Sequence, residues 1–190
     1  MGSRQSLGVD VADDHDARDD ADGDDHGYTE AGSRRGDTEL VTWALEEWER
    51  ASNGLFRFHA YPHEGSALLR IYWLPWARGV LGETRPVLSR GGIVATVFIH
   101  PDISRAIAAA RTDSVRRDVI LYVVCLHEIG HALGLGDSMN EDDIMWTGGH
   151  GRDQMVYERL RRRVDSRAAI KVTSWLSNTD MARVQALYRR

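Results

Sequence analysis

The stretch SVRRDVILYVVCLHEIGHALGLGDS, residues 114–138, carries the most informative pattern in the chain. It is apolar along most of its length, Ser114 stands where a helix would be capped, and Gly134 stands where it would end. These features predict one long helix over residues 114–134. The residues that can do chemistry gather at the end of this helix and in the turn that follows it.

Two histidines and a glutamate occur near the end of the helix, in the order His127-Glu128-Ile129-Gly130-His131. Residues four positions apart lie one turn apart on the same helical face, so both imidazoles can reach one metal ion. The glutamate between them projects beside that ion. One rigid element therefore supplies two metal ligands and a candidate general base.

A third candidate ligand, Asp137, follows His131 after a short glycine-rich turn. A helix continued through residue 137 would carry this carboxylate away from the metal, but Gly134 can adopt the left-handed conformation that turns the chain back. Two neutral histidines and one carboxylate leave a fourth position for water, which is the arrangement of a catalytic zinc site. His150 is the main rival third ligand, although its distance from His131 in sequence does not fit the motif.

The segment HEIGHALGLGDS resembles the zinc-binding motif of the metzincin metalloproteases, and within them the matrixins, whose pattern is H-E-x-x-H-x-x-G-x-x-H followed by a methionine turn. Asp137 stands where most members have histidine, which is similar to the snapalysin-type variant of the clan. Met145 lies at the matrixin spacing after Asp137. The resemblance implies that its side chain forms a floor beneath the metal.

The rest of the chain predicts an α+β fold. The chain has 190 residues, 42% of them hydrophobic, so it can bury a core, and collagen-like, coiled-coil and fully disordered classes are excluded. Periodicity predicts helices over residues 38–52 and 178–189 and strands over residues 55–58, 68–73 and 92–99. The resemblance implies a zincin-like or metzincin-like fold: a twisted, mostly parallel sheet with an antiparallel edge strand, an active-site helix, a methionine turn and a C-terminal helix.

Charge divides the chain into two parts. Residues 1–37 carry 11 acidic and 4 basic side chains, and residues 10–25 read DVADDHDARDDADGDD, with almost nothing to bury. We therefore expect a disordered acidic tail over residues 1–36. Residues 37–190 are expected to form the matrixin-like catalytic domain, with a basic insertion at about 149–176.

The expected activity is zinc-dependent hydrolysis of peptide bonds in protein substrates, with Glu128 as general base for a metal-activated water. The alternative is a catalytically inactive module that binds zinc or peptide. We expect an extended substrate to pair with an edge strand formed by Gly92–Ile99. This assignment makes Gly92, Ile93, Val94, Ala95 and Thr96 candidate substrate-binding residues, with residues 145–171 as the wall of a side-chain pocket.

One catalytic zinc is the expected cofactor. No run rich in histidine and aspartate lies between the second and third strands, so structural zinc or calcium ions are not expected. The expected partner is a protein or peptide substrate, not nucleic acid, because the arginines of residues 159–167 are typical of a solvated helix face. No apolar run reaches membrane-spanning length, and the oligomeric state stays open.

Location stays open between two expectations. No signal peptide opens the sequence as given, which favours the cytoplasm, whereas the family resemblance implies secretion. The single cysteine, Cys125, excludes an internal disulfide but is compatible with either compartment.

Overall fold

The computed structural model describes residues 5–12, 32–60, 67–76, 79–89, 92–147 and 153–189. The elements follow in the order β1 (Gln5–Ala12), α1 (Asp37–Ala51), β2 (Phe56–Ala60), β3 (Leu69–Trp73), β4 (Gly82–Ser89), β5 (Gly92–Ile99), α2 (Ile103–Ala106), η2 (Ala108–Ala110), α3 (Ser114–Ala132), α4 (Asp153–Arg161), α5 (Arg167–Val172) and α6 (Asn178–Tyr188). The three helices and three strands expected from periodicity each form within two residues of their expected bounds.

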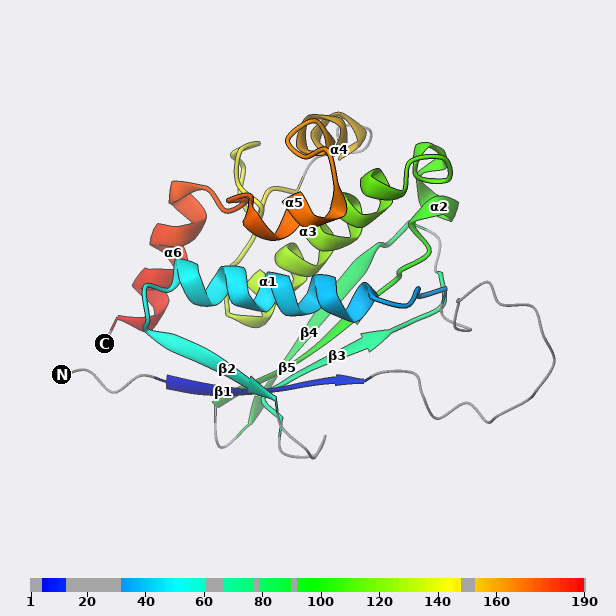
Figure 1. Cartoon of the computed structure of the whole chain (residues 1–190). Coiled ribbons are helices and arrows are strands. Elements are labelled where there is room, and N and C mark those ends of the chain that lie inside the picture. The colour runs from blue at the N-terminus through cyan, green and yellow to red at the C-terminus, as the bar shows by residue number, and fades with distance from the viewer. Residues whose placement is uncertain are drawn as a thin grey trace, which may run out of the picture.

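The strands make a five-stranded sheet in the order β2-β1-β3-β5-β4. The first four strands in this order run parallel, and β4 runs antiparallel to β5 at one edge. Figure 1 shows the helices gathered on one side of the sheet. The predicted fold class, α+β with a mostly parallel sheet and an antiparallel edge strand, is confirmed.

The core lies between the sheet and the helices α1 and α3. Side chains alternate along β3, where Leu69, Ile71 and Trp73 are buried and the residues between them are partly exposed. On α1, Trp48 is fully buried, and its indole Nε1 donates a hydrogen bond to the carbonyl oxygen of Leu126 at 2.9 Å. This contact joins α1 to α3 next to the histidine motif.

The strand β1 corrects the expectation that residues 1–36 are disordered. Gln5–Ala12 pairs with β2 on one side and with β3 on the other, inside the sheet. Residues 32–36 also have defined positions ahead of α1, whereas residues 13–31 lie outside the described residues. The acidic composition of the region made this short strand hard to recognise from the sequence. Its stability comes from pairing with two strands that are distant in sequence.

The strand β4 was not expected from the sequence, because Glu83, Arg85 and Pro86 interrupt any apolar pattern. Proline lacks an N–H and is tolerated in a sheet only where that N–H is not needed, mainly on edge strands. β4 is the last strand of the described sheet, and Glu83 pairs with Arg85 on the exposed side. Its composition therefore suits an edge.

A buried ion network joins the start of α1 to the start of α3. The guanidinium of Arg117, 1% exposed, donates to both carboxylate oxygens of Asp37, to Asp118 and to the carbonyl of Pro101. Burial by itself lowers the pKa of Arg117, but the bonds to Asp37 and Asp118 raise it overall, so the charge is retained. Arg167 extends the network by donating to Asp118 at 2.7 Å.

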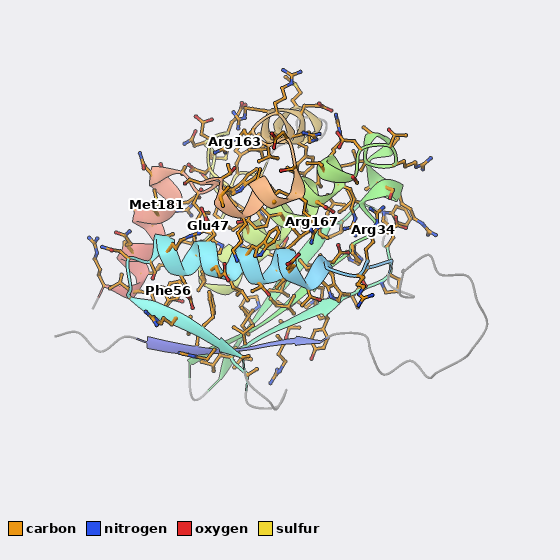
Figure 2. All side chains as sticks on the ribbon, in the orientation of Figure 1. Arg34, Glu47, Phe56, Arg163, Arg167 and Met181 are labelled. Carbon is orange, nitrogen blue, oxygen red and sulfur yellow. The ribbon has the colours of Figure 1, made fainter. Side chains whose placement is uncertain are left out.

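The basic insertion continues this network. It forms α4 and α5, and Figure 2 shows Arg167 and Glu47 among the side chains between α1 and the segment that contains α5. The backbone N–H of Trp175 donates to Glu47 at 3.2 Å. On α4, Arg161 donates to Asp113 at the start of α3 at 2.9 Å, and Glu158 pairs with Arg116. The insertion is therefore part of the packed domain.

We expect Arg117→Met to lower the free energy of unfolding by about 3–5 kcal/mol, because the change leaves the Asp37 carboxylate buried without its partner. Urea denaturation followed by tryptophan fluorescence measures the difference. Arg85→Met is the control, since Arg85 belongs to an exposed pair and its loss should leave the midpoint unchanged. Equal midpoints for the two variants would contradict the role given to the network.

Candidate metal centre

The two histidines of the motif meet at the C-terminal end of α3. The helix is capped by Asp113, whose carboxylate accepts the backbone N–H of Arg116 at 2.9 Å. One turn separates His127 from His131, and their Nε2 atoms are 3.1 Å apart. The same-face placement predicted from the four-residue spacing is therefore present.

The chain turns back directly after α3. Gly134 has φ 96°, in the left-handed region, and the N–H of Leu135 donates to the carbonyl of Gly130 at 3.0 Å. This turn brings Asp137 Oδ1 to 3.4 Å from His131 Nε2 and 4.0 Å from His127 Nε2. The structure thus brings together the three residues predicted as metal ligands.

Backbone carbonyls orient both imidazoles. His127 Nδ1 lies 2.9 Å from the carbonyl oxygen of Ile144, and His131 Nδ1 lies 2.9 Å from that of Leu135. A carbonyl only accepts hydrogen bonds, so each Nδ1 carries the proton and each Nε2 keeps its lone pair. Two nitrogen lone pairs and a carboxylate oxygen then face one another, which is an arrangement that can hold a cation.

Two of the three distances between donor atoms, 3.1 and 3.4 Å, are close to the spacing that zinc requires, and the third is 4.0 Å. Ligand atoms about 2.0–2.1 Å from a tetrahedral zinc lie roughly 3.3 Å from one another. The ligand atoms of His127, His131 and Asp137 all lie within 4.8 Å of one another. Nitrogen and carboxylate donors are those of known zinc enzymes, so the residues present fit zinc.

The turn that carries Met145 packs against α3 at Gly130. Met145 is fully buried, and its carbonyl accepts the N–H of Ser138 at 2.7 Å, which ties the turn to the loop that carries Asp137. A Cβ built on Gly130 would overlap Met145 Sδ and lie 3.0 Å from Trp48. Glycine at position 130 is therefore required for the helix to rest on Met145.

Replacing Gly130 by alanine tests this packing. In an open helix the change would stabilise the protein by about 1 kcal/mol, but here the added methyl must displace Met145, so we expect a loss of about 1–3 kcal/mol. Thermal unfolding of the metal-free chain measures the change. Gly136→Ala is the control, because a Cβ there has its nearest neighbour 4.0 Å away. A Gly130→Ala variant at least as stable as the original would contradict the close contact.

The final helix α6 holds both loops of the site. Asp180 accepts the N–H of Ile144 at 2.7 Å and that of Ser177 at 3.1 Å, and the second bond belongs to the capping box at the start of α6. Arg183 donates to the carbonyl of Gly136 at 2.7 Å and to that of Asp137 at 3.4 Å. The helix therefore positions the methionine turn and the third candidate ligand together.

The side chain of Glu128 extends from α3 toward β4, and the residue is 7% exposed. The hydroxyl of Thr84 on β4 is 2.7 Å from Glu128 Oε2 and 2.8 Å from the carbonyl oxygen of Glu128. Sequence reasoning missed Thr84, because the strand that carries it has no apolar alternation. Nothing in the local sequence marks it as a neighbour of a residue so far along the chain.

A pocket of about 320 Å³ opens beside His127 and Glu128. Apolar side chains from α3, from α4 and from the residue before β4 line part of its wall, namely those of Leu81, Val123, Val124, Val156 and Leu160. Asp143 also contributes to the lining, but its carboxylate accepts the hydroxyl of Ser177 at 2.6 Å and the amide of Asn140 at 3.0 Å. The pocket is therefore suited to an apolar group.

The predicted substrate strand is corrected by the sheet order. Gly92–Ile99 forms β5, which is not an edge strand, because it pairs with β4 along its whole length and with β3 from Ala95 onward. Ala95 and Thr96 are enclosed on both sides, and Gly92, Ile93 and Val94 pair with β4. The edge beside the pocket belongs to β4. The rival ligand His150 lies outside the described residues.

The sheet is mostly parallel, and the long helix above it carries two histidines and a glutamate. A carboxylate lies close to the histidines. This combination is typical of metallopeptidases. A family model described as Matrixin matches residues 26–189. The chain therefore belongs to the matrixin family, which consists of metalloendopeptidases. Within the described residues, no helix is both long and apolar enough to cross a membrane.

Proposed function

We propose that the chain is a zinc-dependent endopeptidase in which His127, His131 and Asp137 hold one zinc ion and Glu128 is the general base. The observation that carries the proposal is the convergence of the three donor atoms next to a pocket that Glu128 also lines. Membership of the matrixin family supports the same activity.

The proposed chemistry uses few side chains. When bound, zinc would polarise the carbonyl of the cut peptide bond and make the attacking water more acidic. Glu128 takes the proton of that water and passes it to the departing amine. Its low exposure limits competition from bulk water, and Thr84 occupies one of its two carboxylate oxygens.

We further propose that the substrate lies extended along β4. The outer edge of this strand offers backbone N–H and C=O groups to a peptide, which is a sequence-tolerant mode of binding. Selectivity then comes from the apolar pocket, whose outer wall is the insertion helix α4 with Val156 and Leu160. We expect preference for a medium or large apolar residue immediately after the cut bond.

A cleavage assay tests the proposal. The purified full chain is incubated with casein and with a peptide library, alone, with a chelator, and with zinc or magnesium added back after chelation. We expect cleavage before apolar residues that is lost on chelation and restored by zinc but not by magnesium. Cleavage that survives chelation would contradict the metal site. Bound zinc without any cleavage would favour a binding module.

A further inference from the structure

Two residues of β4, Gly82 and Thr84, approach the candidate general base from the same side. Alternate side chains of a strand point to the same face, and this face of β4 lies against α3. Arg85 points the other way, where its guanidinium lies 4.9 Å from the centre of the Phe98 ring. The face that touches Glu128 therefore carries a glycine and a hydroxyl.

Gly82 permits the strand to lie unusually close to the glutamate. A Cβ built at this position would be 2.6 Å from Glu128 Cγ, 2.9 Å from Glu128 Oε1 and 2.9 Å from Val124 Cγ1. Any larger residue would have to displace the glutamate or the strand. The side chain of Glu128 is thus packed directly against backbone, which restricts its rotamers.

Thr84 fixes the other end of the same side chain. Its hydroxyl has one proton to donate, and the two acceptors in reach are Glu128 Oε2 and the carbonyl oxygen of Glu128, at 2.7 and 2.8 Å. A hydrogen bond to a charged carboxylate is roughly twice as strong as one between neutral groups, so Oε2 is the favoured acceptor. This bond engages Oε2, so the other carboxylate oxygen, Oε1, is the one that Thr84 does not hold.

We propose that Thr84 is a positioning residue for Glu128, and that Gly82 and Thr84 together hold the carboxylate so that Oε1 faces the substrate. The inference rests on the proposed function, since it assumes that Glu128 transfers the proton. A base that is already held in the reactive orientation does not have to be ordered during the reaction, so the entropic part of the barrier is smaller. This effect raises kcat and leaves substrate affinity unchanged.

The matched variants are Thr84→Val, which keeps the shape and removes the hydroxyl, and Thr84→Ser, which keeps the hydroxyl. Thr42→Val is the control, because the hydroxyl of Thr42 bonds only the carbonyl of Thr38 on the exposed side of α1, at 3.0 Å. We expect Thr84→Val to lower kcat by about 10- to 100-fold with KM within about twofold of the original. Zinc affinity should not change. Thr84→Ser should recover most of the loss.

Several outcomes would overturn the proposal. The first is a Thr84→Val variant with unchanged kcat. The second is a Thr84→Val variant in which KM or zinc affinity changes instead of kcat. The third is a Thr84→Ser variant with a kcat as low as that of Thr84→Val. Crystal structures of the full chain and of Thr84→Val give a readout without turnover. We expect the Glu128 carboxylate to leave its original position in the variant, and an unmoved carboxylate overturns the proposal. If the original chain binds zinc but cleaves nothing, the proposed function fails, while the two structures still decide the positioning role.

Discussion

We expect Glu128→Gln to lower kcat by about 10²- to 10⁴-fold, the usual contribution of a general base, and to leave zinc binding unchanged. The amide has nearly the shape of the carboxylate, and the candidate ligands lie on other residues, so the fold and the metal site should persist. The measurements are steady-state cleavage of a fluorogenic peptide with an apolar residue after the cut bond, and zinc content by elemental analysis.

The control for this result is Glu46→Gln. Glu46 is on α1, its carboxylate pairs with Lys171, and it does not line the pocket. Its activity should equal that of the original chain. Cleavage by Glu128→Gln at the original rate would show that another group moves the proton. Loss of zinc from that variant would show that Glu128 acts as a ligand, contrary to its place beside β4.

We expect Asp137→Ala to weaken zinc binding by at least about 100-fold, because loss of a residue that only supports a ligand already costs about 10- to 100-fold. Asp137→His, the residue most matrixins have at this position, should retain zinc and activity. Asp137→Ala should lose affinity because the Asp137 carboxylate oxygen lies 3.4 Å from His131 Nε2, and without this oxygen only the two imidazoles remain as ligands. Competition with a chelating dye measures the affinity.

Asp142→Ala provides the comparison from the same loop. Its carboxylate is exposed and bonds Arg159 at 3.0 Å instead of facing the histidines. Zinc affinity should be unchanged in this variant. If Asp137→Ala binds zinc as tightly as Asp142→Ala does, Asp137 is not a ligand and a residue outside the described part of the chain, such as His150, becomes the candidate.

The site could be predicted from sequence because its parts are local. His127 and His131 are one helical turn apart, and Gly134 ends that helix with a positive φ, so short-range geometry turns the chain back toward the histidines at Asp137. The methionine turn is also near in sequence, and Gly130 leaves room for Met145. Each step spans only a few residues.

The sheet was less predictable, because pairing between strands depends on segments far apart in the chain. Gln5–Ala12 is one short strand next to a long acidic run, and its partners in β2 and β3 lie more than forty residues away. Average composition over the tail concealed it. β4 was missed for a related reason, since an edge strand need bury only one face and can include Pro86.

The substrate edge was assigned to the wrong strand for the same reason. β5 is apolar and precedes the helix α3, which suggested an edge beside the site. Its hydrogen-bonding groups are occupied by β4 and, from Ala95 onward, by β3. Amino-acid pattern reveals that a segment is a strand, but only the arrangement of the sheet reveals which strand is outermost.

The sequence by itself determined the helix, the pair of imidazoles, the turn at Gly134 and the candidate third ligand, because dihedral preferences and helical spacing act over a few residues. Only the tertiary structure decided that β4 lies against Glu128 and that α6 holds the ligand loop. These contacts join segments tens of residues apart, and they form because packing against a common core brings such segments together.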